Sequence, residues 1–178
     1  SVLEVEGYII HSPHRGFEIA PATADEAETI YLIRVRLEPL AAELVAAHHS
    51  PENIKTLRYW IDQIDEAIEK NDFDAFQRLD SALHDALYEA CTRPQLIKLI
   101  QDVRLSAQRY RHLYNLGHQS RDEMRQTQSE HRRLLKAIEN GDPHLSGQMI
   151  AAGLHRWIRG LLDVLAPDQN YTEHLPQE

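Results

Sequence analysis

One segment of the sequence places a carboxylate and an imidazole where apolar residues would be expected. Asp80 and His84 are four residues apart, so on a helix they project side by side. At about 100° per residue, Asp80 lies within roughly 60° of an apolar stripe formed by Phe73, Phe76, Leu83, Leu87 and Cys91. A buried carboxylate is costly unless a partner satisfies it, and two ligands one turn apart can hold one metal ion.

Two further histidines project from the centres of apolar helix faces, His131 beside Leu134 and Leu135, and His155 beside Ala151 and Ile158. If the helices close around one centre, three imidazoles and one carboxylate come together there. Such a set suits zinc, nickel, iron or manganese, with zinc or nickel preferred, and leaves coordination positions for water or a ligand carboxylate. The predicted metal ligands are Asp80, His84, His131 and His155. Inward histidines are often hydrogen-bonded core residues, so a polar network without metal is the alternative.

Three arginines are the candidates for binding a ligand. Arg34 projects from the apolar face of the first helical segment, with Glu38 one turn later. Two interpretations stay open, because Arg34 could form a helix ion pair with Glu38 or could bind a ligand carboxylate with its bidentate guanidinium. Arg104 and Arg111 share one face of a later segment and are candidates of the same kind.

The elements that position these residues are predicted to be helices. Apolar residues recur every three or four positions from about residue 24 onward. Thr23 and Ser120 begin capping-box patterns, and Ser50 and Asp142 each precede a proline, as at helix starts. The short connections favour an all-α antiparallel bundle, in which Pro39 should kink or interrupt the first helix. The expected helices span 24–48, 51–70, 72–91, 94–116, 120–140 and 142–166.

The two ends of the chain differ from this pattern. Gly7 to Ile10 and Phe17 to Ile19 flank a turn containing Pro13 and Gly16, which predicts a short β-hairpin. Two strands alone are marginally stable in water, so we interpret the hairpin as a remnant of another domain. Residues 167–178 are polar and aperiodic and should form a loose tail.

Composition narrows the class of protein. The chain has 178 residues, enough for one domain, and a net charge of −9 that disfavours general binding to nucleic acid. The single cysteine, Cys91, excludes an internal disulfide and any Cys-x-x-Cys motif. No apolar run of about 18 residues and no basic-then-apolar leader occurs, so we expect a cytoplasmic protein without a membrane partner.

Taken together, three segments resemble the FCD effector-binding domain of FadR-type transcription regulators in the GntR family. They are Arg34-x-x-Leu37-Glu38, Asp80-x-x-x-His84, and the stretch from Glu130-His131 through Asn140-Gly141-Asp142 that precedes His155. In addition, Glu6 to Ile9 followed by Arg15 to Ile19 is similar to the wing of the family's winged helix-turn-helix domain. The helices of that DNA-binding domain are absent from the sequence.

The resemblance implies three parts: a wing remnant over residues 1–22, an FCD domain over 23–166, and the tail. It further implies that Asp80, His84, His131 and His155 hold a divalent metal and that Arg34 contacts a small organic acid. The expected protein is a sensor rather than an enzyme. It would act as a homodimer and contact operator DNA only through the missing N-terminal domain.

A metal-dependent enzyme is the competing hypothesis, because three histidines and one aspartate with open coordination positions could activate water. Glu130 is the candidate base. It is adjacent to His131 and therefore projects about 100° away from it on a helix. The sequence contains no Glu-x-x-His and no His-Glu-x-x-His motif, so neither a di-iron carboxylate bundle nor a metalloprotease is indicated.

Overall fold

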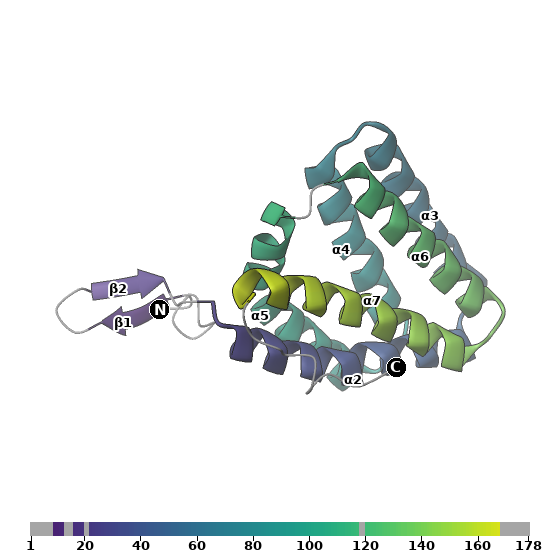
Figure 1. The fold of residues 1–178 in the computed structure, drawn as a ribbon. Helices are drawn as coiled ribbons and strands as arrows, with labels where there is room; N and C mark the ends of the chain where they lie inside the picture. The colour runs from purple at the N-terminus through teal and green to yellow at the C-terminus, as the bar shows by residue number, and fades with distance from the viewer. Residues whose placement is uncertain (1–8, 13–15, 20–21, 118–119, 168–178) are drawn as a thin grey trace.

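The computed structural model describes residues 9–12, 16–19, 22–117 and 120–167, and its main body is all helical (Figure 1). The all-α prediction is confirmed, and each helix begins and ends within about two residues of the expected position. Four of the starts were predictable because the capping residues Thr23, Ser50, Ser120 and Asp142 can be recognised in the sequence. The helices are α2 (Ala24–His48), α3 (Pro51–Glu69), α4 (Phe73–Glu89), α5 (Pro94–Gly117), α6 (Arg121–Glu139) and α7 (Pro143–Leu165).

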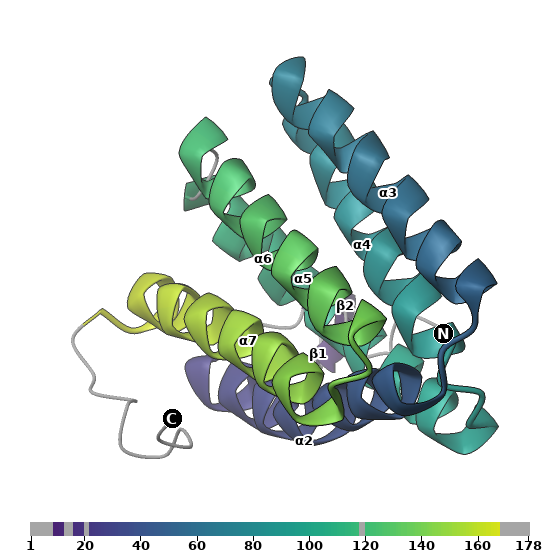
Figure 2. The same ribbon diagram turned by 90° about the vertical axis from the view of Figure 1, so that its right-hand side faces the viewer.

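The helices pack as pairs that enclose a common core. Helices α2 and α7 lie side by side and run in opposite directions, and α3 and α4 form a helical hairpin (Figures 1 and 2). Helix α6 packs on both α3 and α7, and α5 packs on α2. A Cβ on Gly147 would collide with the Glu43 side chain, so glycine permits the close approach of α7 to α2. The largest fully buried apolar side chains include Tyr31, Ile64, Leu87, Ile100, Ile138, Ile158 and Leu161.

Side-chain caps fix the starts of five helices. In each, the side-chain oxygen of the residue before the helix accepts a hydrogen bond from a backbone N–H of the first turn, which would otherwise lack a partner. Ser50 and Ser120 also form full capping boxes with Asn53 and Glu123. The capping residues are Thr23, Ser50, Asp72, Ser120 and Asp142.

Pro39 was predicted to kink or interrupt the first helix, and α2 continues through it without an interruption. Proline removes one backbone donor but does not prevent helical backbone angles. Pro39 is itself buried, and the neighbouring Val35, Ala41 and Ala42 are buried as well. Tertiary packing on both sides of the proline therefore holds the helix together.

Before the helices, strands β1 (Ile9–Ser12) and β2 (Gly16–Ile19) pair antiparallel, with Ile9 opposite Ile19. The remainder of the predicted wing remnant, and residues 168–178 of the predicted tail, lie outside the described residues. Both assignments stay predictions. Among the helices that the structure describes, none combines the length and the apolar character needed to cross a membrane.

One interhelical turn contains a strained residue that yields a test of the fold. Asn71, Thr92 and Gly141 follow α3, α4 and α6 with positive φ angles of 52°, 53° and 64°. The left-handed region costs an L-residue about 1–2 kcal/mol, and β-branched threonine fits it poorly, whereas glycine enters it freely.

We expect Thr92→Gly to raise the free energy of unfolding by about 1 kcal/mol in urea denaturation, because the relief of strain exceeds the entropy that glycine adds to the unfolded chain. Thr56→Gly is the matched control. Thr56 is exposed within α3, so the same change there should lower stability. A loss of stability in both variants would contradict the assignment of strain to Thr92.

Candidate metal centre

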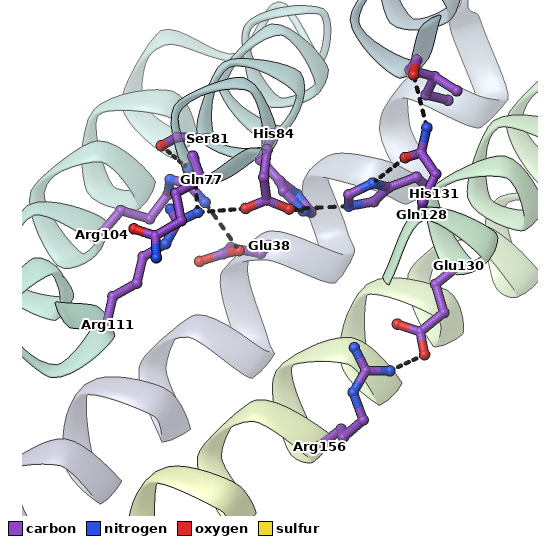
Figure 3. Close-up of polar contacts among 12 residues, drawn as sticks. Glu38, Gln77, Ser81, His84, Arg104, Arg111, Gln128, Glu130, His131 and Arg156 are labelled. Atoms are coloured by element: carbon purple, nitrogen blue, oxygen red, sulfur yellow. Dashed lines mark hydrogen bonds and ion pairs between the residues drawn. The ribbon is translucent and has the colours of Figure 1, made fainter. Parts of the chain in front are cut away.

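Three of the four predicted metal ligands meet in the interior. Asp80 and His84 lie on α4 and His131 on α6, and their potential ligand atoms all lie within 4.8 Å of one another. Asp80 Oδ1 is 3.2 Å from His131 Nε2 and 3.9 Å from His84 Nε2. Figure 3 shows the two imidazoles converging from neighbouring helices. The i, i+4 spacing on α4 and the apolar face of α6 place them there.

The orientation of His131 is fixed by a glutamine one turn earlier. Gln128 is buried, and its Nε2 donates to the Ile61 carbonyl at 2.7 Å and to Asp65 Oδ1 at 2.8 Å. The amide oxygen of Gln128 therefore faces His131 Nδ1, 3.1 Å away, and accepts its N–H. In neutral His131 the proton thus resides on Nδ1, and Nε2 presents a lone pair toward Asp80.

The orientation of His84 is fixed in a similar way, by Tyr88 one turn later. The Tyr88 hydroxyl donates to Glu38 Oε2 at 2.5 Å, so its oxygen is left to accept from His84 Nδ1 at 3.2 Å. Burial lowers the pKa of His84 to about 3 against the attraction of Asp80, so the ring is neutral at pH 7. Its Nε2 lone pair also faces Asp80 Oδ1.

The carboxylate of Asp80 divides its oxygens between two partners. Burial alone would raise its pKa, but the charge of Arg111 and the interactions with His131 and His84 hold the pKa well below its usual range. Arg111 donates to Oδ2 at 2.5 Å, and Oδ1 faces the two imidazoles. Two lone pairs and one anionic oxygen aimed at one another require a cation between them, either a proton on an imidazole or a metal ion.

A second buried carboxylate, Glu38 of α2, organises two of the predicted ligand-binding arginines. Arg34 Nε donates to Glu38 Oε1 at 2.5 Å, which realises the helix pair that the spacing suggested. Arg104 approaches Glu38 Oε2 at 3.9 Å and donates to Ser81 Oγ at 3.3 Å. Burial would raise the pKa of Glu38, but Arg34, Arg104 and the Tyr88 hydroxyl lower it, so Glu38 is ionised.

These groups line one cavity of about 390 Å³, which is the size of an ordinary small-molecule site. All three predicted ligand-binding residues, Arg34, Arg104 and Arg111, line it beside the metal-ligand candidates. Part of the wall is apolar. The aromatic lining residues are Phe73, Phe76, Tyr88, Tyr114 and Trp157.

His155, the fourth predicted ligand, is not among the residues whose ligand atoms lie within 4.8 Å of one another, and its assignment as a metal ligand stays a prediction. The cluster of metal-ligand candidates among the described residues consists of Asp80, His84 and His131, and His155 is absent from the cavity lining. The residues of α7 that line the cavity are Met149, Ile150, Gly153, Leu154, Arg156, Trp157 and Gly160. Glu130, the candidate base, is ion-paired with Arg156 of α7 (Figure 3).

Sequence reasoning missed Gln128, Tyr88 and Arg156. A signal was available for two of them, because Gln128 precedes His131 by three residues and Tyr88 follows His84 by four. Polar side chains at these spacings share a helix face with a candidate ligand and can orient it. Arg156 was hidden because its partner, Glu130, lies on another helix.

Comparison with known proteins is consistent with this architecture. Residues 29–156 match the FCD domain family. A curated relative, the uncharacterized HTH-type transcriptional regulator YdhC of Bacillus subtilis (strain 168), is 27% identical over 166 residues, which are 92% of this chain and 72% of the relative. The structure of E. coli McbR/YncC superposes with a TM-score of 0.82 at 20% identity, covering 91% of this chain and 80% of that one.

A further solved structure, described as a putative transcriptional regulator GntR from Rhodococcus sp. RHA1, gives a TM-score of 0.68 at 18% identity, covering 90% of this chain and 75% of that chain. Fold and family together define the effector-binding domain of a transcription regulator. The chain belongs to the FCD domain family of GntR-type regulators.

The contacts of Gln128 lead to a test of its positioning role. Gln128→Leu keeps the volume but removes the acceptor that fixes the His131 proton on Nδ1. We expect zinc affinity, measured by competition with a chromogenic chelator, to fall about 10- to 100-fold, as for other groups that orient metal ligands. Gln108→Leu, at an exposed position of α5 outside the cavity lining, is the control. Equal affinity in all three proteins would refute this role.

The neutral state of His84 predicts a pH dependence for the metal-free protein. The pKa of His84 is about 3 in the folded state against an ordinary value of 6.5, so the unfolded state binds more protons between these values. Stability should therefore fall as the pH is lowered from 6.5 toward 3. In urea titrations at several pH values, His84→Gln should remove close to one proton from the slope of unfolding free energy against pH. An unchanged slope would contradict burial of a neutral imidazole.

Proposed function

We propose that this domain senses a small organic acid for a GntR-type regulator, and that a divalent metal bound by Asp80, His84 and His131 forms part of the acid site. One observation supports this above all others. Both imidazoles have their Nδ1–H engaged by protein acceptors and aim Nε2 at the same carboxylate oxygen. That is the arrangement of histidine ligands held by a second layer of hydrogen bonds.

The donor set fits zinc or nickel. Two imidazole nitrogens and one carboxylate oxygen are ligands that both metals accept, and iron or manganese is compatible with them. Three protein ligands leave coordination positions open, as in sites that bind a further molecule at the metal. Bound there, the metal would supply a positive charge that attracts the carboxylate of the acid.

The charges of the cavity lining also favour an anion once a metal is present. The lining contains four arginines and four carboxylates, so it is balanced when its histidines are neutral, and a divalent cation makes it positive. The guanidinium groups of Arg34, Arg104 and Arg111 each have five N–H donors, more than their protein partners use. They could therefore hold the acid without releasing Glu38 or Asp80.

In the full-length regulator we infer a homodimer whose N-terminal domains bind operator DNA, with residues 1–22 as the wing remnant of that domain. The acid would act by binding two arrangements of the dimer with different affinity. No turnover is needed for this function. Two observations favour sensing over catalysis. The relative YdhC is a transcriptional regulator, and the candidate base Glu130 is ion-paired with Arg156.

The test is the melting temperature of chelator-treated protein with and without added zinc or nickel. Saturating metal should raise it by roughly 5–10 °C in the wild type, because a ligand bound only by the folded state stabilises that state. His131→Ala should abolish the rise, whereas His144→Ala, at an exposed position, should keep it. A full rise in His131→Ala would overturn the ligand assignment.

A further inference from the structure

The cavity extends beyond the metal-ligand candidates along α5. Helices α4 and α5 run in opposite directions, since Arg104 bonds to Ser81 while Arg111, farther along α5, bonds to Gln77 and Asp80. Asn115 follows Arg111 by four residues, which is about 6 Å along the helix axis. It therefore lies one turn farther from the centre, toward the start of α4, where Phe73 and Phe76 line the same cavity.

Asn115 is the feature of this end that needs explanation. Asn115 is 8% exposed and lines the cavity, and its Nδ2 has no hydrogen-bond partner among the described residues. An unsatisfied buried donor of this kind costs about 1–3 kcal/mol. The lining of the cavity combines aromatic side chains with charged ones, among them Glu123 and Arg156.

Two pairs of aromatic residues belong to the lining of the cavity. Phe73 and Phe76 of α4 have ring centroids 6.3 Å apart, and Tyr114 and Trp157 have centroids 4.8 Å apart across α5 and α7. All four line the cavity. The aromatic part of the lining is thus suited to a flat or elongated apolar body.

We propose that Asn115 recognises a hydrogen-bond acceptor at the far end of the ligand, so that the effector is an elongated acid. Its carboxylate lies at the arginines and the metal-ligand candidates, its apolar body lies between the aromatic residues, and a carbonyl or similar oxygen accepts from Asn115 Nδ2. The carboxylate end of this assignment rests on the proposed function. The acceptor end rests on the buried amide alone.

The Asn115 amide should make the domain prefer ligands with an acceptor oxygen over apolar analogues, and this preference can be measured. A ligand carrying a carbonyl oxygen at its far end satisfies Nδ2, whereas an apolar analogue of the same shape leaves it unpaired. Sites built around buried polar groups reject such analogues. We expect about a tenfold difference in affinity, which corresponds to about 1.4 kcal/mol.

The experiment is calorimetric titration of the zinc-loaded protein with two pairs of monocarboxylates. The pairs are 4-acetylbenzoate with 4-isopropenylbenzoate, and 5-oxohexanoate with 5-methylhexanoate, which differ in the oxygen and not in length. The variants are Asn115→Leu and Asn115→Asp. Gln108→Leu, at an exposed position of the same helix, is the control.

We expect the wild type and Gln108→Leu to prefer the carbonyl member of at least one pair about tenfold. Asn115→Leu should lose that preference, and Asn115→Asp should reverse it because an anionic oxygen faces the carbonyl. Retention of zinc-induced stabilisation in both variants shows that the fold is intact. If acids bind but the preference is absent from the wild type or survives in Asn115→Leu, the acceptor assignment is wrong while the acid-sensing function stands. If none of the acids binds any of the proteins, both are overturned.

Discussion

The site depends on how one buried carboxylate, Asp80, divides its two oxygens. Oδ2 accepts from Arg111 of α5, and Oδ1 faces the imidazoles of α4 and α6. Each partner comes from a different part of the chain, so the carboxylate joins three helices at one point. Without Arg111 the charge of Asp80 would lack compensation in the interior. Without Asp80 the two imidazoles would have no carboxylate between their Nε2 atoms.

A second layer of contacts extends this centre to two further helices, α2 and α3. Tyr88 connects His84 to Glu38 on α2, and Gln128 connects His131 to Ile61 and Asp65 on α3. A change in the cation between the imidazoles therefore reaches α2 and α3 through two hydrogen bonds each. Rigid, fully paired networks of this kind specify one arrangement of side chains, which is what a selective binding site requires.

Helix positions were predictable because caps and apolar period are local properties of the sequence, as at Ser50 and Ser120. The convergence of Asp80, His84 and His131 was also predictable, since each interrupts an apolar stripe. His155 interrupts an apolar stripe in the same way but lies outside the group of three. Projection gives a residue's face on its own helix but not the neighbour that covers it, and α7 packs against α2 as well as bordering the cavity. Asn115 gave no signal because its burial arises only from tertiary packing.

The balance of charge in the cavity connects the metal to the acid. Each lining arginine is paired with a protein oxygen, so the lining by itself offers little net attraction for an anion. A divalent cation at the imidazoles changes that balance and strengthens anion binding in a low-dielectric interior. Thermodynamic reciprocity then requires that the acid raise the affinity for metal by the same factor. Metal and acid would thus act as one composite ligand, and a regulator built this way responds to the acid only when metal is available.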